Sequence, residues 1–159
     1  MKTSKIRIIG GSLKGNHISF PSSSKLRPTS NKLREILFNW LNFEIAGFKC
    51  VDCFSGSGAL GIEAISRGAQ SATFIEKTPK FAASIEANLE RLNISEKCEI
   101  KIKNAFDWLK EDSLEYLDLI FNHHLDFTTI PNFMFTKWII KLWLLNICRC
   151  HRRGLERCR

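Results

Sequence analysis

The chain has 159 residues, of which 44% are hydrophobic and 25% charged, so it can bury one core but is short for two domains. It has no uncharged apolar run of the roughly 18 residues that a membrane span needs, and its first twenty residues lack the apolar centre of a secretion signal. We therefore expect one soluble domain in the cytoplasm, without a membrane partner.

The formal charge of +8 is distributed unevenly along the chain. Residues 1–49 hold nine Lys or Arg and two Glu, residues 50–126 hold eight basic and thirteen acidic side chains, and residues 127–159 hold seven basic and one acidic. A basic N-terminal segment beside an acidic domain is typical of proteins that contact a phosphate backbone. The alternative is a solvated basic tail.

The six cysteines predict reduced thiols, because nothing in the sequence indicates secretion. Cys50 and Cys53 have the spacing of a CxxC pair but lie in an apolar run, which favours buried packing. A zinc site is the alternative reading of the C-terminal end, with the ligands Cys148, Cys150, His151 and Cys158. No element that would hold these ligands in place can be recognised around them, so we expect no bound metal.

The N-terminal third contains a glycine-rich basic segment and then a helix. Residues 6–18 alternate apolar runs with paired glycines, which predicts a short, mobile hairpin or loop. A linker-like stretch over residues 21–30 ends at Ser30, a helix N-cap candidate. Apolar residues then recur at helical spacing on one face, at Leu33, Ile36, Leu37, Trp40 and Leu41.

Strands and helices alternate from residue 50 to residue 121. Apolar runs predict strands at 50–54, 72–77, 99–102 and 117–121. Between them we expect a helix closed by Gly68, a second begun by Thr78 and Pro79, and a short helical turn over residues 106–109. This alternation predicts an α/β fold with a mostly parallel sheet.

The alternation stops after residue 127. Residues 138–145 could form a helix, but they are apolar all round rather than on one stripe. We therefore divide the chain into a basic N-terminal arm (1–30), an α/β domain (31–126) and an aberrant basic, apolar-rich tail (127–159), with the sheet truncated or aberrant after its fourth strand.

The motif that indicates chemistry is the glycine turn after the first parallel strand. Gly56, Gly58 and Gly61 form GxGxxG, a pattern that also fits a nicotinamide dinucleotide site or a turn needed only for tight packing. Two acidic residues near this turn indicate which kind of ligand it could bind. Asp52 can bind an ammonium group, directly or through water, and Glu76 can accept both hydroxyls of a ribose. A nucleoside with a cationic amino-acid tail satisfies both.

Four segments occur in an order that we recognise: RIIGGSLKG, LRPTSNKLREILFNWL, DCFSGSGALGIEAISRGA and ATFIEK. From about residue 6 to residue 121 the chain resembles the ribosomal RNA small subunit methyltransferase D family. The resemblance implies a Rossmann-like class I methyltransferase that uses S-adenosylmethionine to methylate a guanine exocyclic amine (N2). It further implies small-subunit ribosomal RNA, or the assembling small subunit, as the partner of a monomer.

The resemblance also implies site residues. The methionine part of the cofactor would contact Asp52, Phe54, Gly56 and Gly58, its ribose Glu76, and its adenine Asn104, while Ser55 and Ala105 are further residues of the cofactor site. Asn104 stands where the family usually has Asp, and its amide oxygen can still accept a hydrogen bond. The RNA would contact Arg7, Lys14, Arg27, Thr29 and Arg34.

The chain departs from the family where the catalytic motif is expected. The family's fourth strand ends in Asp-Pro-Pro-Phe, whereas this chain continues with Asn122, His123 and His124. An aromatic amine is a poor nucleophile, so an oxygen acceptor on a stiff turn must orient it toward the methyl group. Asn122 could accept a hydrogen bond from the amine and His123 could act as a base, but both lack the stiff turn that the prolines provide.

A shifted reading frame would explain both the motif and the tail. If the Asn codon ends in C, the bases that encode Asn-His-His-Leu can also encode Pro-Pro-Phe in another frame. Two other functions stay open at this point: an adenine-N6 DNA methyltransferase, which shares the motif chemistry, and an inactive remnant that binds S-adenosylmethionine or RNA.

Overall fold

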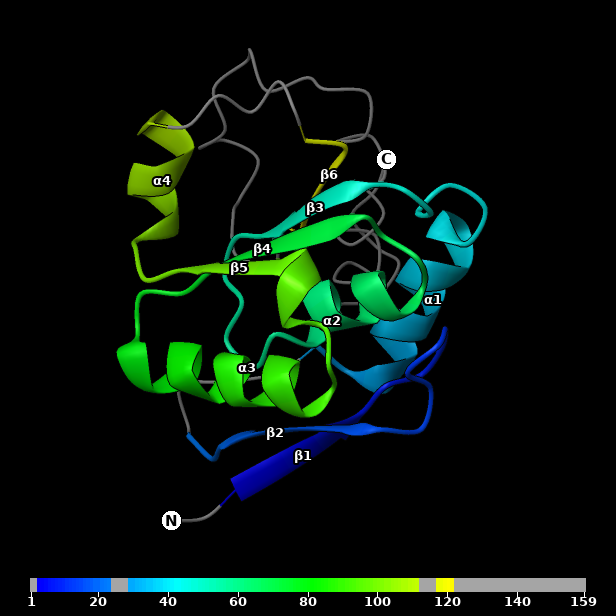
Figure 1. Ribbon diagram of the computed structural model, residues 1–159, viewed down its shortest axis with the longest axis horizontal. Coiled ribbons are helices and arrows are strands. Elements are labelled where there is room, and N and C mark those ends of the chain that lie inside the picture. The colour runs from blue at the N-terminus through cyan, green and yellow to red at the C-terminus, as the bar shows by residue number, and fades with distance from the viewer. Residues whose placement is uncertain (1–2, 24–28, 112–116, 122–159) are drawn as a thin grey trace, which may run out of the picture.

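The computed structural model describes residues 3–23, 29–111 and 117–121 as a parallel sheet flanked by helices (Figure 1). The four parallel strands lie in the order β5-β4-β3-β6. Their bounds are β3 Lys49–Asp52, β4 Ser71–Ile75, β5 Cys98–Lys101 and β6 Leu119–Phe121. The predicted α/β fold with a parallel sheet is confirmed.

The helices form layers on both faces of the sheet. Helices α1 (Asn31–Leu41), α2 (Ala59–Ser66) and α3 (Pro79–Arg91) lie between the sheet and an N-terminal hairpin, whereas α4 (Ala105–Glu111) lies on the opposite face (Figure 1). A 3-10 turn, η1 (Ser95–Lys97), precedes β5. Among the described residues, no helix is long and apolar enough to cross a membrane.

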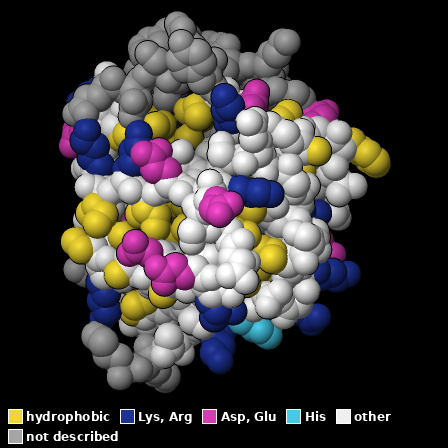
Figure 2. Space-filling view, viewed as in Figure 1, with side chains coloured by type: hydrophobic (Ala, Val, Ile, Leu, Met, Phe, Trp, Pro, Cys, Tyr) yellow, Lys and Arg dark blue, Asp and Glu magenta, His cyan; other side chains and the backbone are white. Residues whose placement is uncertain are grey.

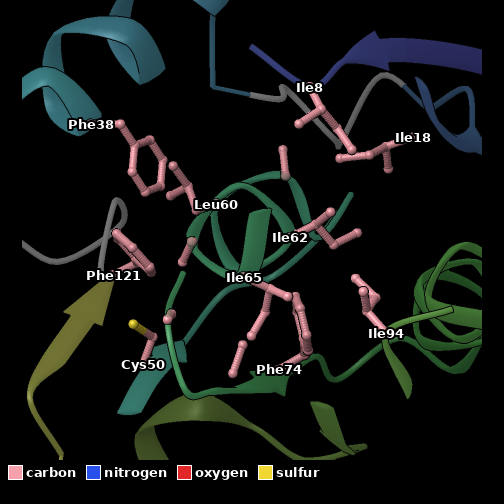
Figure 3. Packing of buried hydrophobic residues seen from close by; sticks show 14 of the residues in the cluster. Ile8, Ile18, Phe38, Cys50, Leu60, Ile62, Ile65, Phe74, Ile94 and Phe121 are labelled. Carbon is pink, nitrogen blue, oxygen red and sulfur yellow. The ribbon is translucent and has the colours of Figure 1, made fainter. Parts of the chain in front are cut away.

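Both faces of the sheet are apolar because buried strands alternate their side chains between two helix layers. On one face Phe74 and Phe121 pack with the helices α1 and α2, and the rings of Phe38 and Phe121 are 5.8 Å apart (Figure 3). On the other face Val51 and Ile120 pack with Trp108 of α4. The sheet is therefore covered on both sides.

The two cysteines with CxxC spacing are free and buried on opposite faces of the sheet. Burial raises the pKa of the Cys50 thiol to about 12 and raises that of Cys53 as well. The predicted packing role is confirmed. No group of three or more potential metal ligands occurs within the described part of the chain. The four zinc candidates near the C-terminus lie outside the described residues.

The N-terminal segment differs from the mobile arm that the sequence predicts. Strands β1 (Thr3–Arg7) and β2 (His17–Pro21) form an antiparallel hairpin whose inner residues belong to the core: Ile6, Ile8, Ile18 and Phe20. Asn88 of α3 binds the outer edge of β2, since its amide accepts from the Ser19 nitrogen and donates to the Ser19 carbonyl. The hairpin is thus a packed layer of the domain.

Glu63 of α2 connects three parts of this layer. Its side chain is fully buried and accepts four hydrogen bonds. The donors are the backbone nitrogens of Ile9 and Gly10 (3.0 and 2.7 Å), Arg34 Nη1 (3.1 Å) and Arg67 Nε (3.0 Å). Because a buried carboxylate without partners is costly, this arrangement fixes the hairpin and α1 against α2.

The contacts of Arg34 correct its expected role in binding RNA. Its guanidinium is buried and donates to Glu63, to the Arg7 carbonyl (2.8 Å) and to Asn31 Oδ1 (2.7 Å). Burial lowers the pKa of Arg34, and the Glu63 carboxylate opposes this effect. A side chain held in this way is a structural ion pair and does not face phosphates.

We predict that Glu63→Gln lowers the free energy of unfolding by about 3 kcal/mol, because the buried guanidinium of Arg34 loses its counter-charge. Urea unfolding followed by circular dichroism measures the change. Glu86→Gln, at an exposed position of α3, is the control and is expected to change stability by less than about 0.5 kcal/mol. Equal stability of both variants would contradict the role given to Glu63.

Candidate functional site

A cavity of about 810 Å³ opens at the carboxyl edge of the sheet. Its walls come from the end of β2, the residue before Ser30, the turn after β3, and the loops that follow β4 and β5. These loops leave the sheet at the left-hand edge in Figure 1, toward the first turns of α3 and α4. Ligands of open parallel sheets bind at this edge.

The turn after β3 depends on its glycines in two ways. Gly58 has a φ of 74° and stands as the N-cap of α2, a left-handed conformation that other residues rarely adopt. Gly61 allows α2 to approach β4, because a Cβ at this position would lie 2.4 Å from the Phe74 ring. The motif therefore brings the start of α2 and its backbone against the cavity.

Asp52 lies at the end of the inner strand β3 and lines the cavity. Its side chain is 1% exposed, and Oδ2 accepts a hydrogen bond from the Gly61 nitrogen (3.2 Å), while Oδ1 is buried without a partner. Burial raises the pKa of this carboxyl to about 7, the nearby Glu76 adds to the rise, and the backbone groups of Gly61 and Phe54 oppose it. A buried carboxyl that lines a cavity and has an unpartnered oxygen is suited to a ligand that brings a donor, such as an ammonium group.

Glu76 follows the neighbouring inner strand β4, so the order of the sheet places it beside Asp52. Its carboxylate accepts from the nitrogens of Gly56 (2.9 Å) and Thr78 (2.8 Å) and thereby joins the turns after β3 and β4. A carboxylate offers about four acceptor positions. Glu76 can therefore bind these two nitrogens and still accept vicinal hydroxyls of a sugar.

The third part of the site follows β5. Asn104 is exposed, and its Oδ1 accepts from the Phe106 nitrogen (2.9 Å) at the start of α4. The ring of Phe106 meets that of Phe54 edge-on at 5.6 Å between centroids. Together with Ala105 and Ile75, these rings provide an apolar surface for a flat heterocycle.

Of the eight cofactor residues predicted from the sequence, seven line this one cavity: Asp52, Phe54, Ser55, Gly56, Glu76, Asn104 and Ala105. The eighth, Gly58, is the N-cap of α2 and is not among the residues that line the cavity. Ser55 also holds the turn itself, because its hydroxyl donates to the carbonyls of Asp52 (2.7 Å) and Ile75 (3.2 Å). Whether these residues bind a cofactor stays a prediction.

The predicted RNA residues do not gather at one place. Thr29 lines the cavity, whereas Arg7 and Lys14 are exposed on the hairpin segment away from it. Arg27 and the catalytic candidates Asn122 and His123 lie outside the described residues. On the face shown in Figure 2, basic and acidic side chains are interspersed, so no patch of one sign covers it.

Sequence reasoning missed several residues that line the cavity, namely Ser22, Ser23, Lys77, Lys80, Lys103 and Phe106. Four of these six come within a few residues after the ends of β4 and β5. Their positions after predicted parallel strands were a usable signal, since such ends meet at one edge. Ser22 and Ser23 gave no signal, because only the tertiary structure brings β2 to this edge.

The parallel sheet between helix layers, with a cavity at its carboxyl edge, is a Rossmann-like methyltransferase fold. A solved structure of an Escherichia coli protein named as a methyltransferase superposes with a TM-score of 0.61 and 40% identity, over 67% of this chain and 56% of that one. A methylase from Haemophilus influenzae gives a TM-score of 0.61 at 34% identity, over 74% of this chain and 62% of that one.

Residues 6–124 match the family described as Conserved hypothetical protein 95, and the chain belongs to this family. A Buchnera aphidicola relative named Ribosomal RNA small subunit methyltransferase D is 48% identical over 76% of this chain and 62% of its own length. The protein of the same name from Escherichia coli is 43% identical over 67% of this chain and 54% of its own. The chain thus spans less than two thirds of the length of these relatives, and the resemblance seen in the sequence is confirmed.

We predict that ionisation of Asp52 destabilises the protein without ligand. The unfolded carboxyl titrates near 3.8 and the folded one near 7, so between these values the unfolded chain releases a proton that the folded chain retains. Stability therefore falls as pH rises through this window. Asp52→Asn should remove this decrease in stability. The variant should unfold at a higher urea concentration than the parent at pH 8, and the two midpoints should differ least below pH 4. Parallel pH profiles for both proteins would refute this, and Glu86→Gln serves as the control.

Proposed function

We propose that this chain binds S-adenosylmethionine in the cavity at the sheet edge and belongs to an enzyme that methylates the N2 amine of a guanine in small-subunit ribosomal RNA. The observation that carries the proposal is the pairing of two carboxyls across one glycine turn, with Asp52 Oδ1 unpartnered. The name shared by the relatives supports the substrate.

The residues of the cavity fit the parts of this cofactor. The ionised Asp52 would hold the ammonium group, and Glu76 would accept the ribose hydroxyls. Phe106 would contact the adenine, with Asn104 at its amino group. When bound, the cofactor supplies a methyl group on a sulfonium centre. The protein's contribution is to position that centre and exclude water.

The first test is calorimetric titration with S-adenosylhomocysteine, which keeps the ammonium and the ribose. We expect binding by the parent protein, with affinity about tenfold weaker at pH 6 than at pH 8, because a carboxyl with a pKa of about 7 is largely protonated at the lower value. Asp52→Asn should bind weakly at both pH values. Glu86→Gln should behave as the parent.

A folded parent protein without affinity for S-adenosylhomocysteine would refute the proposal. Binding of NAD instead of S-adenosylhomocysteine would support the alternative that the glycine motif forms a nicotinamide dinucleotide site. A pH-independent affinity in the parent would remove Asp52 from the ammonium site even if the ligand binds.

The second test measures transfer of tritiated methyl groups. We expect unmethylated small-subunit particles to be labelled in preference to DNA duplexes, because the relatives are named for ribosomal RNA. Labelling of DNA adenine would support the adenine-N6 alternative. Binding of S-adenosylhomocysteine without any transfer would identify an inactive remnant, and sequencing the gene would then show whether one insertion or deletion restores Pro-Pro-Phe.

We also propose that Arg7 and Lys14 contact RNA phosphates from the outer side of the hairpin. Both side chains are exposed, and Arg7 lies on the strand face opposite the buried Ile6 and Ile8. Thr29, at the cavity, is proposed as a separate contact, and Arg27 lies outside the described residues. Lysine and arginine in such positions supply affinity that depends on salt and does not read sequence.

A further inference from the structure

Three exposed lysines surround one side of the cavity. Lys77 follows β4, Lys80 lies in the first turn of α3, and Lys103 follows β5. We call these three residues the lysine collar. They come from two neighbouring strand ends of the parallel sheet, so the fold rather than the sequence order brings them together.

The rest of the wall carries little charge. The lining residues from the end of β2 and from the position before α1, namely Pro21, Ser22, Ser23 and Thr29, are uncharged. Among the ionisable side chains that line the cavity, the collar faces only the carboxyls of Asp52 and Glu76, which are 1% and 8% exposed. None of the ion pairs found among the described residues involves Lys77 or Lys80. Among the described residues that line the cavity, the exposed charges are therefore those of the collar.

The proposed cofactor does not account for this charge. S-adenosylmethionine carries a sulfonium and an ammonium against one carboxylate, so three lysines at the entrance repel it overall. Charges of one sign at the mouth of a cavity attract a ligand of the opposite sign. A polyanion that passes the entrance explains the collar, and the phosphate backbone of the second substrate is such a polyanion.

We propose that the lysine collar binds the phosphates of the RNA strand next to the nucleotide whose base enters the cavity. This inference rests on the proposed function and deepens it, because it places the strand at the ends of β4 and β5. It adds a binding surface separate from the hairpin, at the entrance itself.

The test compares two variants that each lose two positive charges. The collar variant is Lys77→Gln with Lys80→Gln. The control is Lys49→Gln with Lys97→Gln, because both lysines are exposed at the opposite, amino edge of the sheet, where β3 and β5 begin. Filter binding to a transcript of small-subunit ribosomal RNA is measured from low to high salt, and S-adenosylhomocysteine binding is measured by calorimetry on the same preparations.

We expect the collar variant to bind the RNA more weakly, with a slope of log affinity against log salt that is shallower by roughly 1.4, or about 0.7 for each single-strand phosphate that a lysine no longer neutralises. The control should keep the parent slope. All three proteins should bind S-adenosylhomocysteine equally, since the product lacks the sulfonium charge and the collar is not part of its site.

An unchanged slope in the collar variant would overturn the inference, as would an equally large decrease in the control, which would indicate only a general effect of charge. Failure of the collar variant to bind S-adenosylhomocysteine, with an unchanged RNA slope, would assign the lysines to the cofactor and also overturn it. A parent protein that binds S-adenosylhomocysteine but not RNA would refute the collar and the RNA substrate but not the cofactor site. A parent that binds RNA but not S-adenosylhomocysteine would refute the proposed function while the collar comparison still stands.

Discussion

The close approach of α2 to the sheet is the constraint on which the other features depend. At Gly61 the helix lies so near the Phe74 ring that no side chain fits between them. The backbone nitrogen of Gly61 also donates a hydrogen bond to the Asp52 carboxylate. This bond joins the first turn of α2 to the end of β3. Only because α2 starts at this point does the turn of residues 53–58 present its backbone to the cavity.

The same helix organises the layer on its outer side. Glu63, two residues after Gly61, accepts from the hairpin, from α1 and from Arg67 just after the end of its own helix. Ser22, just after β2, and Thr29, just before α1, both line the cavity. Helix α2 therefore lines the cavity with Ala59 and Leu60. Through Glu63 it also fixes the hairpin and α1, the two elements next to Ser22 and Thr29.

The site also shows a conflict between stability and binding. Asp52 is buried with one oxygen unpartnered, which makes its ionised form unfavourable in the protein alone. A cationic ligand would stabilise the ionised carboxylate of Asp52, and this stabilisation would add to the affinity for the ligand. Strained polar groups of this kind are common at binding sites, where the ligand supplies the missing partner. The lysine collar, by contrast, is exposed and adds charge without a comparable cost.

The sequence by itself determined the order of strands and helices from residue 50 to residue 121, because apolar periodicity and the residues that begin and end helices are local signals. The glycine motif and the acids after strands also identified Asp52, Gly56 and Glu76, since such residues occupy known places in parallel folds, and the family resemblance added Phe54, Ser55, Asn104 and Ala105. The tertiary structure alone decided the roles of Arg34 and of the hairpin. A guanidinium near the start of a helix can be solvated or buried, and only the position of Glu63 on another helix settles which. The same holds for Lys77, Lys80 and Lys103, whose common position follows from the pairing of β4 with β5, which joins segments far apart in the chain.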